Sequence, residues 1–173
     1  IGEGAPADVF ASADEKNMAK VKEQAPDPQL FAGNTLVIAV PKGNPGAVAT
    51  LADLARVTTV LCAPEVPCGA ASQTLLSNAG VAVTPASSEQ NVTAVLTKVA
   101  ASEADAGLVY ATDVNGRDDV ETIVPAGADA VVNRYPIAAL TGAPNPEAAA
   151  AFVAFVLGQD GQRVLADAGF RAP

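Results

Sequence analysis

Residues 62–76 are the part of the sequence whose residue types could do chemistry, by binding a small anion. Cys62 and Cys68 bracket a proline-containing loop, and small residues follow from Gly69 onward. This pattern predicts a strand end, a loop and a helix start. The first N–H groups of a helix lack partners and carry the positive end of its dipole, so small side chains there leave room for an anion. A loop stapled only for stability is the alternative.

The chain has two cysteines and no histidine. No further thiol or imidazole is present to complete a zinc site, and Ser-His-Asp and Cys-His catalysis are excluded. We expect Cys62 and Cys68 to form a disulfide, which indicates export. Free thiols or a weak metal site in a reducing compartment are the alternatives.

The composition of the chain limits the classes of molecule that it is expected to bind. The 173 residues are half hydrophobic and carry a net charge of −9, with no basic cluster. This acidity argues against binding to nucleic acid or to an anionic membrane surface.

An enzyme remains an alternative function, although nothing in the sequence would activate a nucleophile. Its candidate acid–base groups are Asp8, Asp14, Glu65, Glu89 and Asp113.

Apolar runs and helical stripes alternate along the chain, which predicts an α/β fold with mostly parallel sheets. Ser12 is interpreted as a helix cap. The main expected strands are 34–41, 57–62, 81–86, 106–112 and 130–140. The main expected helices are 70–78, 92–99 and a pair within 145–169 that is broken at Gly158 or Gly161.

Three features should meet at one edge of the sheet. They are the helix start at Cys68, the helix start at Val92 after the capping Asn91, and Tyr110 near a strand end. In open α/β sheets, ligands bind outside the carboxyl ends of the strands. Backbone amides and a phenol hydroxyl donate hydrogen bonds, so the expected ligand is an anion.

Several segments in order resemble the periplasmic molybdate-binding proteins of ABC importers. They are Gly4–Asp14, Asn34–Lys42, Val66–Gly69, Gly107–Tyr110, Tyr135–Ala138 and Gly169–Phe170. The resemblance implies a two-lobed type II solute-binding fold with an incomplete first lobe. Residues 1–35 would be the first-lobe remnant, 36–138 the second lobe, and 139–173 C-terminal helices that return to the first lobe.

The same resemblance implies the binding residues. Molybdate or tungstate would be held by the backbone N–H groups of Cys68 and Val92 and by the hydroxyl of Tyr110. The metal would be bound only inside its oxyanion, without a cofactor and without catalysis. Alternatives are a carrier for another oxyanion such as sulfate, or the ligand-sensing domain of a regulator.

The resemblance also implies a partner and a location. The partner would be the permease of an ABC transporter, and the protein would be periplasmic or at the cell surface, with a lipid anchor as one means of attachment. Relatives of this kind have a preceding strand, helix and strand with two serine loops. Without them we expect an exposed edge and self-association near Val9, Phe10, Phe152 and Phe155.

Overall fold

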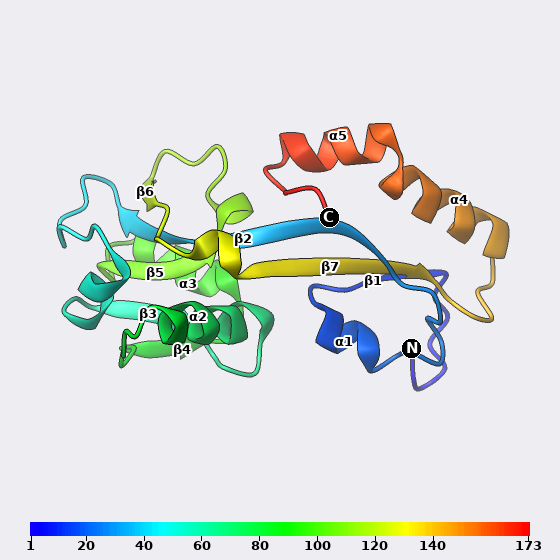
Figure 1. Ribbon diagram of the computed structural model, residues 1–173, viewed down its shortest axis with the longest axis horizontal. Coiled ribbons are helices and arrows are strands. Elements are labelled where there is room, and N and C mark those ends of the chain that lie inside the picture. The colour runs from blue at the N-terminus through cyan, green and yellow to red at the C-terminus, as the bar shows by residue number, and fades with distance from the viewer. The chain divides into compact units, whose positions relative to one another are not determined.

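A computed structural model describes all residues, 1–173, and the chain forms two compact units (Figure 1). Unit 1 contains residues 1–33 and 133–173, and unit 2 contains residues 34–132. The strands β2 (Gln29–Pro41) and β7 (Val132–Ala139) carry the chain from one unit to the other. Both divisions fall inside these strands, at 33/34 and 132/133, and the divisions predicted from the sequence, at 35/36 and 138/139, lie in the same two strands.

Unit 2 is built on a sheet that includes the second part of β2. Its other strands are β3 (Thr59–Cys62), β4 (Ser87–Glu89), β5 (Ala106–Tyr110) and β6 (Val120–Ile123). β3 pairs in parallel with β4 and β5, while β2 pairs antiparallel with β5 and β6. The sheet is mixed, which corrects the expectation of mostly parallel pairing. Parallel neighbours need a crossover, and helices provide one only along the path from β3 to β5.

The crossover helices of unit 2 are α2 (Pro67–Asn78) and α3 (Val92–Ala100). The apolar stripe predicted for α3 is confirmed, because Val95, Leu96 and Val99 are at most 4% exposed. They pack with buried residues of β2, β3 and β5 in one core. Short 3₁₀ helices complete the unit: η1 (Leu51–Ala55), η2 (Ala111–Asp113) and η3 (Ala128–Ala130).

Unit 1 is assembled from the two ends of the chain. The strand β1 (Val9–Ala11) pairs antiparallel with β7, with Val9 opposite Ala139. The predicted helix break lies at Gly158, between α4 (Pro146–Leu157) and α5 (Gln159–Asp167). Aromatic rings of Phe31, Tyr135 and Phe170 pack in a row, with centroid separations of 6.2 and 5.6 Å.

The start of α1 (Glu15–Ala19) corrects the interpretation of Ser12 as its cap. Asp14 is the N-cap, and its carboxylate accepts the N–H of Asn17 at 2.5 Å. The Ser12 hydroxyl instead donates to the carbonyl of Asp14 at 2.7 Å. The Asp14 carboxylate lies two residues closer to the helix and reaches its first turn. The Ser12 hydroxyl is already hydrogen-bonded within the preceding turn.

Two phenylalanines of α4 lie at the surface of unit 1. Phe152 and Phe155 are 53% and 54% exposed, and Ala149 is the one buried residue of this helix. Self-association through this surface stays a prediction. No helix of the chain combines the length and the apolar character needed to cross a membrane.

Candidate functional site

The candidate site lies at the edge of the unit 2 sheet where β3, β4 and β5 all end. Cys62 lies opposite Glu89, and Val60 lies opposite Gly107, so the three parallel strands run to the same edge. The loop before α2 follows β3, the start of α3 follows β4, and η2 follows β5. This topology places Cys68, Val92 and Tyr110 on elements that begin or end at one edge.

The first turn of α2 leaves a backbone donor open. Val66 is its N-cap and offers no side-chain acceptor. The N–H groups of Gly69 and Ala70 both donate to the carbonyl oxygen of Val66, each at 3.0 Å, whereas no hydrogen bond within the chain uses the N–H of Cys68. An anion at this helix end would therefore find an unused donor together with the positive end of the dipole.

Gly69 is the residue that lets the start of α2 lie against the preceding turn. A Cβ atom built on Gly69 would be 1.8 Å from the carbonyl oxygen of Ala63 and 2.9 Å from that of Cys62. Both contacts are with backbone, which cannot swing away as a flexible side chain would. Only glycine allows this approach, so Gly69 fixes where the N–H of Cys68 lies.

The expected disulfide is present between Cys62 and Cys68. The sulfur atoms are 2.08 Å apart, and the Cα atoms are 5.7 Å apart. Both residues are only 4% exposed. The bond ties the last residue of β3 to the first turn of α2, and therefore restrains the same N–H group that Gly69 positions.

Replacing both cysteines by serine is expected to lower the free energy of unfolding by about 2 kcal/mol, because closing so short a loop restricts the unfolded chain. The affinity for an oxyanion should fall as well, since the first turn of α2 becomes more mobile. Urea denaturation and calorimetry measure the two effects. An unchanged stability under oxidising conditions would contradict the prediction.

The start of α3 is capped on one donor only. The side chain of Asn91 accepts the N–H of Ala94 at 2.9 Å, which confirms Asn91 as the predicted cap. No hydrogen bond within the chain has the N–H of Val92 as its donor. Val92 is half-buried. The first N–H of this helix can therefore donate to water or to an anion, as the N–H of Cys68 can.

Tyr110 is the last residue of β5 and is 8% exposed. It lies opposite Leu36 of β2, and its N–H donates to Oδ2 of Asp113 at 2.9 Å. Burial raises the pKa of the Asp113 carboxyl above its ordinary value, and the hydrogen bond from Tyr110 offsets this only in part. The carboxylate thus supports the backbone of Tyr110 while lying in a poorly solvated place.

Asp113→Asn is expected to stabilise the chain at pH 7. A carboxyl whose pKa is raised on folding disfavours its ionised form, so its stability penalty grows as the pH rises through the unfolded value and then the folded value. The amide oxygen of asparagine can still accept the N–H of Tyr110. Denaturation at pH 3 and pH 7 should show a gain at pH 7 that shrinks at pH 3. A gain of equal size at both pH values would argue against a titration effect.

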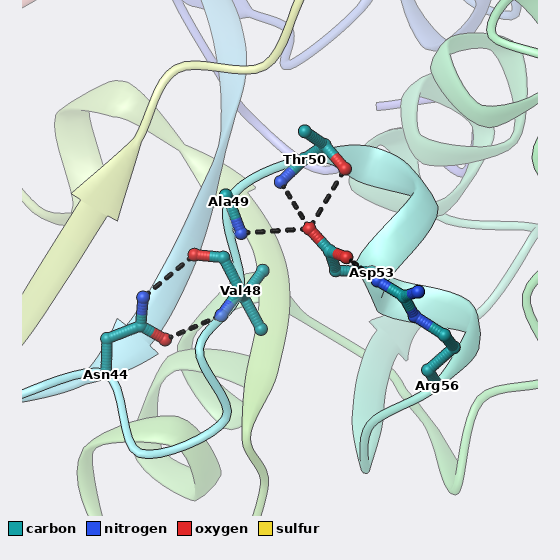
Figure 2. Close-up of polar contacts among 6 residues, drawn as sticks. All are labelled: Asn44, Val48, Ala49, Thr50, Asp53 and Arg56. Atoms are coloured by element: carbon teal, nitrogen blue, oxygen red, sulfur yellow. Dashed lines mark hydrogen bonds and ion pairs between the residues drawn. The ribbon is translucent and has the colours of Figure 1, made fainter.

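The start of η1 shows how this chain satisfies a helix end that needs no ligand (Figure 2). Oδ2 of Asp53 accepts the N–H of Ala49 at 3.0 Å and the N–H and hydroxyl of Thr50 at 2.8 and 2.9 Å. The two N–H groups, followed by the hydroxyl, lower the pKa of Asp53 to about 2. Arg56 pairs with the same carboxylate. The Asp53 carboxylate therefore acts as the anion at the start of η1, whereas no side-chain carboxylate of the chain binds the start of α2.

The carboxylates considered for catalysis are mostly engaged elsewhere. Glu89 pairs with Lys98, which together with the Ser87 hydroxyl lowers the pKa of its carboxyl. Asp8 accepts the backbone and side-chain N–H groups of Asn145. Asp14 caps a helix, as described above. No group of three or more His, Cys, Asp or Glu side chains is placed to hold a metal ion.

Sequence reasoning missed the buried amide of Asn34. Its side chain is 1% exposed, and its Nδ2 donates to the hydroxyl of Thr112 at 2.7 Å, two residues beyond Tyr110. The one local indication in the sequence was that Asn34, a polar residue, lies just before the apolar part of its strand. The pairing partner lies 78 positions away in the sequence, which no local pattern reveals.

Residues 1–171 match the family of bacterial extracellular solute-binding proteins. The chain belongs to this family. A curated relative from Mycobacterium tuberculosis H37Rv, the molybdate-binding protein ModA, is 42% identical over 179 residues, which cover 100% of this chain and 69% of the relative. The expected kind of protein, a solute-binding protein on an α/β fold, is thereby confirmed.

Solved structures of other solute-binding proteins share the fold. The periplasmic molybdate-binding protein of Azotobacter vinelandii matches with a TM-score of 0.80 at 21% identity, over 99% of this chain and 81% of that chain. The sulfate-binding protein SubI of M. tuberculosis H37Rv matches with a TM-score of 0.70 at 20% identity, over 98% of this chain and 70% of that chain. At such identities these likenesses show the type II solute-binding fold and leave the ligand open.

Proposed function

We propose that this chain belongs to a protein that captures molybdate or tungstate outside the cytoplasm and delivers it to the permease of an ABC transporter. The observation that carries the proposal is the 42% identity with a molybdate-binding protein over the whole of this chain. The unused N–H groups of Cys68 and Val92 at one sheet edge support it.

The binding chemistry follows from the donors. The N–H groups of Cys68 and Val92 and the hydroxyl of Tyr110 would each donate to an oxygen of the anion. A fully deprotonated dianion accepts hydrogen bonds and donates none, so a site made of donors favours it over protonated phosphate, which leaves its own donor without an acceptor. The ion is held by its oxygens, with no direct bond between metal and protein.

We propose that the protein binds and releases its ligand unchanged, without a cofactor. Its location would be the periplasm or the cell surface, in keeping with the extracellular family and with a buried disulfide. A lipid anchor is one way in which it would stay at the membrane.

Sulfate is the second candidate ligand, because a sulfate-binding protein shares the fold. Sulfate is also a tetrahedral dianion, so the same donors would serve it, and the size of the site would decide between the two. A ligand-sensing domain of a regulator would bind its effector in the same place, and would be recognised by an attached DNA-binding segment.

A thermal-shift screen of oxyanions on the complete mature protein tests the proposal. Molybdate and tungstate should raise the melting temperature in a concentration-dependent manner, while phosphate should not. Calorimetry then gives the affinities. A rise with sulfate alone would replace molybdate by sulfate, and no response to any of these anions would refute the proposal.

A further inference from the structure

Asn34 links the first strand of unit 2 to the turn that follows Tyr110. It is the first residue of unit 2, on β2, and it lies two residues before Leu36, which pairs with Tyr110. Its Nδ2 donates to the Thr112 hydroxyl at 2.7 Å, and its Oδ1 accepts the N–H of Thr35 at 3.0 Å. The hydrogen bond to Thr112 therefore continues the attachment of β5 to β2 beyond the last ladder pair.

The turn after Tyr110 is held from two sides. Thr112, in the middle of η2, is bound by Asn34, and Asp113, at its end, accepts the N–H of Tyr110. The turn begins at the residue directly after Tyr110, so a shift of the turn moves the backbone from which the tyrosine side chain projects. Hydrogen-bond strength falls steeply as distance and angle become less favourable, so a small displacement of the Tyr110 phenol would weaken its hydrogen bond to a ligand.

We propose that Asn34 is a positioning residue for oxyanion binding: through Thr112 it fixes the turn after β5 and thereby the hydroxyl of Tyr110. This inference rests on the proposed function. A purely structural role for the same hydrogen bond predicts lost stability and no selective loss of affinity.

The test uses single and double variants of the complete mature protein, with molybdate as the probe. Thr112→Val keeps the side-chain shape and removes the acceptor, and it should weaken binding on the order of tenfold, because a misplaced Tyr110 hydroxyl loses much of its hydrogen bond to the anion. Asn34→Leu should act in the same direction. Thr112→Ser retains a hydroxyl and should restore most of the affinity.

A double-variant comparison shows whether the effect passes through Tyr110. In a Tyr110→Phe background, Thr112→Val should cause little further loss, because the group that it positions is already gone. Thr59→Val is the matched control. It removes another buried threonine hydroxyl, which donates to the Leu54 carbonyl at 2.8 Å, and it should lower stability without lowering affinity.

The possible outcomes separate this inference from the proposed function. If the unaltered protein fails to bind molybdate, the proposed function and this inference both fall. If Tyr110→Phe weakens binding while Thr112→Val and Asn34→Leu do not, only the positioning role is wrong. Equal losses from Thr112→Val with and without the Tyr110 hydroxyl would also overturn it.

Discussion

Gly69→Ala is expected to abolish molybdate binding and to destabilise unit 2 by about 3 kcal/mol or more, at the upper end of the range for overpacking. The added methyl group would be 1.8 Å from the carbonyl oxygen of Ala63. Relief requires the first turn of α2 to move away from the turn at residues 63–66, which displaces the N–H of Cys68. Calorimetry with molybdate and urea denaturation measure the two losses.

Gly2→Ala is the matched control, because a Cβ atom there meets nothing within 4 Å. It should leave both stability and affinity as they are. A Gly69→Ala protein that keeps its stability and binds molybdate normally would show that the close approach at the start of α2 has no role in the site.

Tyr110→Phe is expected to weaken molybdate binding by about 1.5–3 kcal/mol, the usual worth of a hydrogen bond to a charged group. This corresponds to roughly a 10- to 150-fold rise in the dissociation constant. The ring stays in the core at the end of β5, so stability should change little. Titration calorimetry on folded protein measures the effect.

Tyr135→Phe provides the comparison, since it removes the other phenol of the chain, in the aromatic row of unit 1. It should leave the affinity unchanged. If Tyr110→Phe also leaves it unchanged, Tyr110 is a core residue without a binding role.

The sequence predicted those features that local physics decides. The Asn91 cap and the apolar face of α3 follow from spacing and residue type, which also predicted a helix break at Gly158 or Gly161. The disulfide followed from the presence of two nearby cysteines, with no histidine or further cysteine to complete a zinc site. The order of several short motifs was enough to indicate the family, although each motif alone is weak.

The sequence did not predict features that depend on contacts between residues far apart in the chain. The sequence predicted a strand over residues 81–86, whereas the structure has the short β4, which pairs with β3 over Ser87–Glu89. The antiparallel pairing of β2 depends on which strands it meets, and the Asn34–Thr112 hydrogen bond joins residues far apart in the chain. The need for glycine at position 69 arises from the path of the preceding backbone.

The division of the chain between its units imposes an order on folding. Unit 2 is one uninterrupted segment, whereas unit 1 needs β7, from beyond that segment, to pair with β1. As a chain emerges from the ribosome or a translocation pore, unit 2 has all of its residues available before unit 1 does. Until then β1 lacks β7, the strand with which it pairs in the structure, and is open to wrong partners. Strands that are distant in sequence pair slowly, so shielding residues 9–11 during this interval should raise the yield of folded protein.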